Sequence, residues 1–467
     1  MEKIKKIDRK PPRFKVGPKE ILSSNVLKTL FKLSIPTMVA FAFQTTFNFV
    51  DRFFISRLGD LQLGAIGMSF AVQSILIAIG SGIGAGSSSI VARLIGAKRE
   101  KDAGIAAEHS MLIIVAFSLL FTVFGPLLTR PLFLLLGASR RMLPYILNYI
   151  NIILMGSFFQ FFSMIGNGII RGEGNTVTPM RVMLAGTFTN IVMDPILIFG
   201  FGPIPSMGIR GAAIATVIGR GVSSLILALS LFGKKNIVKM NFKIFRFDFS
   251  FVRGIFSVGG PSIISQLASS LGLSLLFVIL KRYGDTVKAA FTMGFTYQQV
   301  AFLPLLGVSM GVLTMTGQNY GARNYGRVRE VLLKALISTM LIMGGFTLLF
   351  SLGSEPLIRV FSRDVEVIKA GRTLLIILSL GFPFVAVRMV VVNLFQGLGK
   401  GFRALVLNLM QMVLLTVPLA ALFSYFIGVN GVWYGFLTGN VLTAVVAMIW
   451  AFSTISKLTK QNTKANV

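Results

Sequence analysis

Long apolar stretches, separated by short polar or basic segments, run along almost the whole chain. Many exceed 20 residues, enough for a helix to cross a hydrocarbon layer of about 30 Å. Helices are expected because each backbone group left unbonded in lipid costs several kcal/mol. The pattern predicts twelve spans, at residues 27–57, 63–92, 104–128, 143–169, 179–202, 208–232, 251–281, 287–317, 329–353, 367–395, 403–426 and 429–454.

The composition supports an integral membrane protein. Of 467 residues, 54% are hydrophobic and 13% charged, and the mean hydropathy is +0.78, far more apolar than a soluble protein of this size. The chain has no cysteine, which excludes disulfides, thiolate nucleophiles and cysteine-ligated metals. We interpret the single histidine, His109, as a helix-end residue rather than a ligand.

The net charge of +30 comes from basic residues that lie mainly between the apolar stretches. We therefore expect contact with anionic lipid headgroups and no binding of nucleic acid. Basic residues concentrate in the N-terminal tail and after the second, sixth and eighth predicted spans. The positive-inside rule then places both termini in the cytoplasm, as in a multi-pass protein of a prokaryotic plasma or inner membrane. The N-terminal segment is too long and too charged for a cleaved signal.

The second half of the chain repeats landmarks of the first half at a constant spacing, which we call the repeat offset. A proline, a Gly-Asp pair and a Gly-Ala-basic triplet recur at this spacing, at Pro36 and Pro261, 59–60 and 284–285, and 96–98 and 321–323. Six spans per half make the repeats parallel. We therefore predict an all-α membrane protein, with two parallel six-helix lobes around a central cleft. The expected segments are a basic cytoplasmic tail (1–24), an N-lobe (25–232), a cytoplasmic interlobe linker (233–250), a C-lobe (251–455) and a cytoplasmic tail (456–467).

Two acidic residues, Asp51 and Asp194, lie well inside predicted spans. A carboxylate at such a position costs a few kcal/mol and usually has a function. The repeat places Leu276 opposite Asp51 and Val417 opposite Asp194. The fold itself therefore does not require an acid at either position.

Polar residues in the same half accompany the two acids. Asn190 precedes Asp194 by four residues, on the same helix face, and Thr216 and Tyr149 lie in neighbouring spans. Such an oxygen-rich set could exchange a proton or hold Na⁺. Hydrogen bonding between helices is the structural alternative.

Three further residues interrupt predicted spans. Pro36 frees a backbone carbonyl and permits a bend, so we expect a hinge there. Arg220 and Arg388 could line the cleft or pair with backbone carbonyls.

Several motifs resemble the multidrug and toxic compound extrusion (MATE) family of antiporters, closest to its DinF-like prokaryotic branch: "LSIP", "VD", "GNGIIRGEGN", "NIVMDPILI" and "GAAIAT". The resemblance implies that Asp51, Asn190, Asp194 and Thr216 form a cation site, with Tyr149 as a hydrogen-bonding neighbour. Some relatives carry asparagine where this chain has Met164. The NorM-like branch places acids in its seventh and tenth spans, which contain none here.

The expected function is antiport by alternating access, driven by H⁺ or Na⁺ and exporting small organic compounds of cationic or amphipathic character. We expect a monomer that is not an enzyme and needs no cofactor besides the coupling ion. One alternative is a flippase for a lipid-linked precursor, which would have a cleft lined by several cations. A second is an intramembrane aspartyl protease, but the Gly-Asp pairs lie in "RLGD" and "RYGD" at span ends, without the required GxGD motif.

Overall fold

The computed structural model describes residues 16–233 and 236–465, which are almost entirely helical. The helices of the first half are α1 (Pro18–Ser23), α2 (Val26–Ser56), α3 (Asp60–Gly96), α4 (Glu100–Leu135), α5 (Leu143–Met155), α6 (Ser157–Gly172), α7 (Val177–Phe199) and α8 (Ile209–Leu231). Those of the second half are α9 (Phe249–Leu280), α10 (Gly284–Gly321), α11 (Tyr325–Leu352), α12 (Ser354–Arg359), α13 (Val365–Leu380), α14 (Phe382–Gly397), α15 (Gly401–Leu409), the π-helical segment Met410–Thr416, α16 (Val417–Ile427) and α17 (Val429–Ala465).

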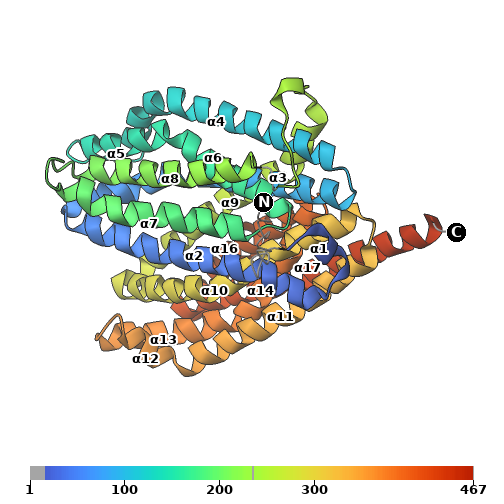
Figure 1. The fold of residues 1–467 in the computed structure, drawn as a ribbon. Coiled ribbons are helices and arrows are strands. Elements are labelled where there is room, and N and C mark those ends of the chain that lie inside the picture. Colours follow the sequence, from blue (N-terminus) through green and yellow to red (C-terminus); the bar gives the residue numbers. More distant parts are fainter. Residues whose placement is uncertain (1–15, 234–235, 466–467) are drawn as a thin grey trace, which may run out of the picture.

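The predicted all-helical membrane architecture is confirmed. Within the described residues, nine helical stretches are long and apolar enough to cross a membrane, or up to eleven when each bent pair forms one span. One of these stretches, Phe249–Gly321, contains both α9 and α10. The helices run side by side, with α4 to α8 in the upper part of Figure 1 and α10 to α13 in the lower part.

Two predicted spans are bent rather than straight. The span predicted at 143–169 consists of α5 and α6, which meet at Gly156 with an angle of 51°. The span predicted at 367–395 consists of α13 and α14, which meet at Gly381 with an angle of 43°. The two glycines are separated by the repeat offset, so the bend is part of the repeat.

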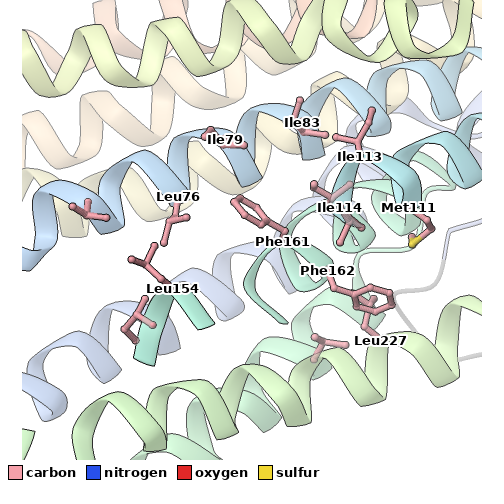
Figure 2. Close-up of a cluster of buried hydrophobic side chains, with 14 of the residues drawn as sticks. Leu76, Ile79, Ile83, Met111, Ile113, Ile114, Leu154, Phe161, Phe162 and Leu227 are labelled. Carbon is pink, nitrogen blue, oxygen red and sulfur yellow. The ribbon is translucent and has the colours of Figure 1, made fainter. Parts of the chain in front are cut away.

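An apolar cluster holds the helices of the first half together (Figure 2). Ile83 of α3, Ile114 of α4 and Phe161 of α6 are fully buried in it. Below them in Figure 2, Leu227 of α8 closes the same cluster near Phe162. This packing holds α3, α6 and α8 in place around the polar residues described below.

The two halves pack closely at one end of the bundle, which we call the basic end. There α2 and α9 begin and α3 and α10 finish. A Cβ added at Gly82 would lie 2.9 Å from the carbonyl oxygen of Gly259, and one added at Gly307 would lie 2.8 Å from that of Ser34. The repeat offset relates Gly82 to Gly307 and Ser34 to Gly259. The repeat found in the sequence is therefore also a repeat of contacts between the halves.

Part of the predicted N-terminal tail docks on the basic end. Residues 1–15 lie outside the described residues, but α1 packs with Ile21 fully buried. Arg327 of α11 donates hydrogen bonds to the carbonyl oxygens of Ile21, at 3.0 Å, and of Ser24. At the other terminus, α17 continues to Ala465, through most of the predicted tail. The helix end and α1 lie at the right of Figure 1.

The predicted linker between the halves docks on the first half through backbone N–H groups. The side chain of Glu173 accepts from Val238 N at 3.0 Å, and that of Glu108 accepts from Asn241 N at 2.5 Å. His109 Nε2 accepts from Asp248 N at 2.9 Å, while its Nδ1 lies 2.8 Å from the carbonyl oxygen of Ile105.

These contacts give His109 a structural role. Its ring is fully buried and packs against three phenylalanines, Phe245, Phe247 and Phe251. The interpretation of His109 as a helix-end residue is wrong, because it lies inside α4, well after the first residue Glu100, and its ring anchors the linker there.

Candidate functional site

The two candidate acids occupy matching positions near helix ends. Asp51 lies five residues before the last residue of α2, and Asp194 lies five residues before the last residue of α7. Both helices run away from the basic end and pack against each other. The site therefore lies in the half of the bundle opposite the tight contacts between Gly82 and Gly259.

Asp194 is completely buried. Its Oδ1 accepts a hydrogen bond from Asn190 Nδ2 at 2.9 Å, one helical turn earlier. Its Oδ2 is also buried, and it has no hydrogen-bond partner among the described residues. A buried carboxylate oxygen without a donor is costly, so the site favours either the protonated acid or a bound cation.

Asp51 interacts electrostatically with three buried or partly buried side chains of the first half. These are Asp194, Tyr149 and Arg220. Tyr149 is 4% exposed and shares a hydrogen bond with the side chain of Gln73 on α3. Four helices besides α2 thus contribute to one polar cluster: α3, α5, α7 and α8.

Helix α8 approaches this cluster through a small residue. A Cβ added at Gly219 would lie 3.1 Å from Asn190 Cβ. The next residue, Arg220, is partly buried, and its Nη1 is fully buried without a hydrogen-bond partner among the described residues. Thr216, one turn earlier, donates to the carbonyl oxygen of Ala212 at 3.0 Å. This leaves the lone pairs of the Thr216 hydroxyl for a second contact.

Pro36 is buried within α2, which continues through it as one helix. The missing N–H leaves a carbonyl one turn earlier without its helical partner. Pro36 lies in the half of α2 nearest the basic end, two residues from Ser34, which contacts Gly307.

Two other residues singled out in the sequence lie elsewhere. Arg388 Nη1 donates to Asn408 Oδ1 at 2.6 Å, so this nitrogen pairs with a side chain of α15 rather than with a backbone carbonyl. Met164 packs between helices, where a Cβ added at Gly80 of α3 would lie 2.7 Å from its sulfur. A methionine here fills the interface between α3 and α6.

The cluster has the chemistry of a proton or hard-cation site. It combines two carboxylates with two amides and a phenol, and oxygen ligands are those that hard cations prefer. The structure joins the Thr216 hydroxyl to Ala212 rather than to these groups. Groups of three or more His, Cys, Asp or Glu side chains are absent from the described part of the chain. Any cation would therefore share its coordination among the two acids and neutral oxygens.

Sequence reasoning did not identify Gln73 and left the place of Arg220 open. Gln73 interrupts the apolar stretch 63–92 and could have been found as a polar residue within a span. Arg220 could be placed only once the packing of α8 against α7 was known.

The chain matches known proteins over nearly its whole length. The MatE family model matches residues 36–196 and 261–422, so the two matches begin at the equivalent residues Pro36 and Pro261. A protein named FAD transporter from Shewanella oneidensis is 29% identical over 430 residues, which are 91% of this chain and 94% of the relative. The probable multidrug resistance protein NorM of Thermotoga maritima is 26% identical over 442 residues, 93% of this chain and 94% of the relative.

A solved structure described as the outward-facing conformation of a multidrug resistance MATE family transporter of the MOP superfamily has the same fold. Its TM-score is 0.90 and its sequence identity 30%, and the match covers 95% of this chain and 99% of that one. The family resemblance seen in the motifs is confirmed. The chain belongs to the MatE family, a family of multi-pass membrane transporters rather than enzymes.

Proposed function

We propose that this protein exports small organic compounds of cationic or amphipathic character in exchange for H⁺ or Na⁺. The observation that carries the proposal is the fully buried Asp194. One of its carboxylate oxygens has no hydrogen-bond partner among the described residues, and the charge of Asp51 lies nearby. Two neighbouring acids repel each other when both are ionised. A proton or a cation relieves this repulsion, so its arrival can be linked to a change of conformation.

Alternating access would follow from this linkage. With both acids ionised, the first half holds cargo or a cation. Protonation or Na⁺ binding from outside neutralises the pair, α2 bends at Pro36, and cargo is released outward. The close packing of the halves at the basic end supports an outward-facing state, and the similar solved structure is described as outward-facing.

The energy of one inward charge suffices for useful export. Across about 150 mV it is worth roughly 3.5 kcal/mol. At about 1.36 kcal/mol per decade, this supports a cargo gradient of a few hundredfold if one net charge moves per cycle.

The decisive experiment measures efflux from proteoliposomes with an imposed pH or Na⁺ gradient, applied separately. Asp51→Asn and Asp194→Asn should each abolish gradient-driven efflux. Asp60→Asn, which changes an exposed acid in the first turn of α3, should transport normally. Undiminished efflux by both site variants would refute the proposal.

The remaining expectations belong to the same proposal. Both acids lie in the first half, which is the arrangement expected of the DinF-like branch, and we assign the chain to it. We place the basic end and both termini in the cytoplasm. We further propose that the protein is a monomer with lobes at 25–232 and 251–455, and that its basic end contacts anionic lipid headgroups.

A second cargo class is an anionic flavin dinucleotide. One relative is named FAD transporter, and the buried Nη1 of Arg220 is a hydrogen-bond donor without a partner among the described residues. The same proteoliposomes, loaded with either FAD or a cationic dye, distinguish the two classes. If the flavin is the cargo, the wild type should export FAD and Arg220→Met should abolish that export.

A further inference from the structure

A cavity of about 450 Å³ lies at the basic end, where the two halves meet. Its wall comes from α3 in the first half and from α9, α10 and α11 in the second. Two arginines and two tyrosines supply its polar groups: Arg93, Arg323, Tyr320 and Tyr325. This cavity is separate from the cluster around Asp194, since α3 reaches it with its last turns rather than its middle.

The two arginines reach the cavity from opposite halves. Arg93 Nε donates to the carbonyl oxygen of Ser89 at 3.2 Å, and its guanidinium lies against Gly399, where an added Cβ would collide with Nη1. Arg323 follows the end of α10 with a left-handed backbone, φ 57°. The ring centroids of Tyr320 and Tyr325, which also line the cavity, lie 5.9 Å apart.

The ion pairs formed within residues 16–233 and 236–465 include neither of these two guanidinium groups. Three acids at this end pair with other bases: Glu20 with Lys32, Asp102 with Arg99, and Glu330 with Lys334. Two more, Glu108 and Glu173, accept backbone N–H groups of the linker. The ends of α3 and α10 each contribute about half a negative charge. They offset about one of the two positive charges, so an excess remains.

We propose that this cavity binds a phosphate-bearing anion, either a soluble phosphate compound or the headgroup of an anionic lipid. Guanidinium groups bind phosphate oxygens through paired, charge-assisted hydrogen bonds, and the tyrosine hydroxyls can donate two more. The volume admits such a group without any movement of the helices.

The location gives the bound anion a conformational effect. It contacts α3 on one side and α10 and α11 on the other, so it can bind well only while the basic end is closed. A ligand that prefers one state shifts the population toward that state. The anion therefore stabilises the conformation seen here, and this effect does not depend on the cargo or the coupling ion.

The binding test uses the full-length protein in nanodiscs of phosphatidylcholine, titrated with inorganic phosphate at constant ionic strength. A second arm replaces part of the lipid with phosphatidylglycerol and omits phosphate. A saturable rise in melting temperature with phosphate identifies a soluble ligand, and a rise with phosphatidylglycerol alone identifies a lipid headgroup. Either result supports the proposal, and a rise in neither arm overturns it.

Arginine variants connect the response to the cavity. Arg323→Gln changes an exposed residue that follows a helix end. Glutamine must adopt the same left-handed backbone as arginine does there, so the variant should fold. It should weaken the apparent affinity about tenfold or more, the loss expected for a charged hydrogen bond. Arg93→Gln should do the same. Arg329→Gln, an exposed arginine on α11 outside the cavity, should not, and equal affinity in all four proteins would refute the assignment.

The conformational test exploits the absence of native cysteine. Spin labels at Lys101→Cys and Gly326→Cys lie on exposed positions of α4 and α11. A closed basic end brings the two spin labels closer together than an open one. Saturating phosphate or phosphatidylglycerol should therefore increase the fraction of molecules with the shorter distance between the labels, and Arg323→Gln should remove this response. An unchanged distance distribution in the wild-type background would contradict the stabilising role.

Discussion

The Cα of Gly321 at the end of α10 lies directly against the carbonyl oxygen of Arg93 on α3, so that a Cβ added at Gly321 would collide with that oxygen. The contact has a symmetric counterpart, because a Cβ added at Gly96 would collide with the carbonyl oxygen of Gln318. The repeat offset relates Gly96 to Gly321 and Arg93 to Gln318. Two glycines thus allow α3 and α10 to cross with their backbones in contact.

Alanine at either glycine should force this crossing apart. Gly96→Ala and Gly321→Ala add a methyl group against backbone atoms, an overpacking cost of about 1–3 kcal/mol that applies only to the closed basic end. We therefore expect longer distances between spin labels at Lys101→Cys and Gly326→Cys. Gly345→Ala, on α11 with open space around it, is the matched control. Identical distance distributions in all variants would show that the crossing does not hold this end closed.

The stability of Asp194→Asn separates a functional acid from a structural one. An amide oxygen can still accept the hydrogen bond from Asn190, and the substitution removes a buried charge beside Asp51. The melting temperature should therefore stay the same or rise, while transport is lost. A large fall in melting temperature would favour the structural reading, in which Asp194 mainly joins helices.

The hydrogen-exchange rates of single backbone amides in the linker should show which contacts dock it on the first half. Glu173→Ala, Glu108→Ala and His109→Ala each remove the acceptor of one N–H group, those of Val238, Asn241 and Asp248 respectively. An N–H that loses its acceptor gives up about 1–3 kcal/mol, so exchange should accelerate first at the corresponding amide.

The control for the linker is Glu100→Ala, an exposed residue in the first turn of α4. It should leave exchange in residues 236–248 unchanged. Equal protection of Val238, Asn241 and Asp248 in all variants would mean that other contacts dock the linker.

Features that repeat or interrupt a pattern could be predicted from the sequence. The offset between Pro36 and Pro261 also relates the packing of Gly82 and Gly307, because equivalent residues make equivalent contacts. Asp194 stood out because a carboxylate in an apolar stretch is costly wherever the helix packs.

Features that depend on distant partners could not be predicted. The bends at Gly156 and Gly381 leave the apolar stretches unbroken, so hydropathy alone gives continuous spans. His109 acquires its role through the linker, since its ring accepts a hydrogen bond from the backbone N–H of Asp248, 139 residues away. Gln73 and Arg220 joined the cluster only when α3 and α8 were placed around Asp51.

The arginine beside the acids should tune how strongly they hold the coupling ion. Arg220 interacts with Asp51 and Tyr149, and its Nη1 is buried without a partner in the described residues. A neighbouring unit positive charge opposes the binding of another cation by about 2 kcal/mol. Arg220→Met removes that opposition, so the ion concentration for half-maximal efflux should fall by about tenfold or more.

Arg220→Lys provides the matched control, since it keeps the charge and should keep the ion dependence of the wild type. The measurement is efflux from proteoliposomes as a function of pH or of external Na⁺, with whichever ion drives transport in the wild type. Because Arg220→Met also removes a poorly satisfied buried charge, the variant should remain folded. Equal ion dependence in the methionine and lysine variants would show that the charge of Arg220 does not act on the acidic pair.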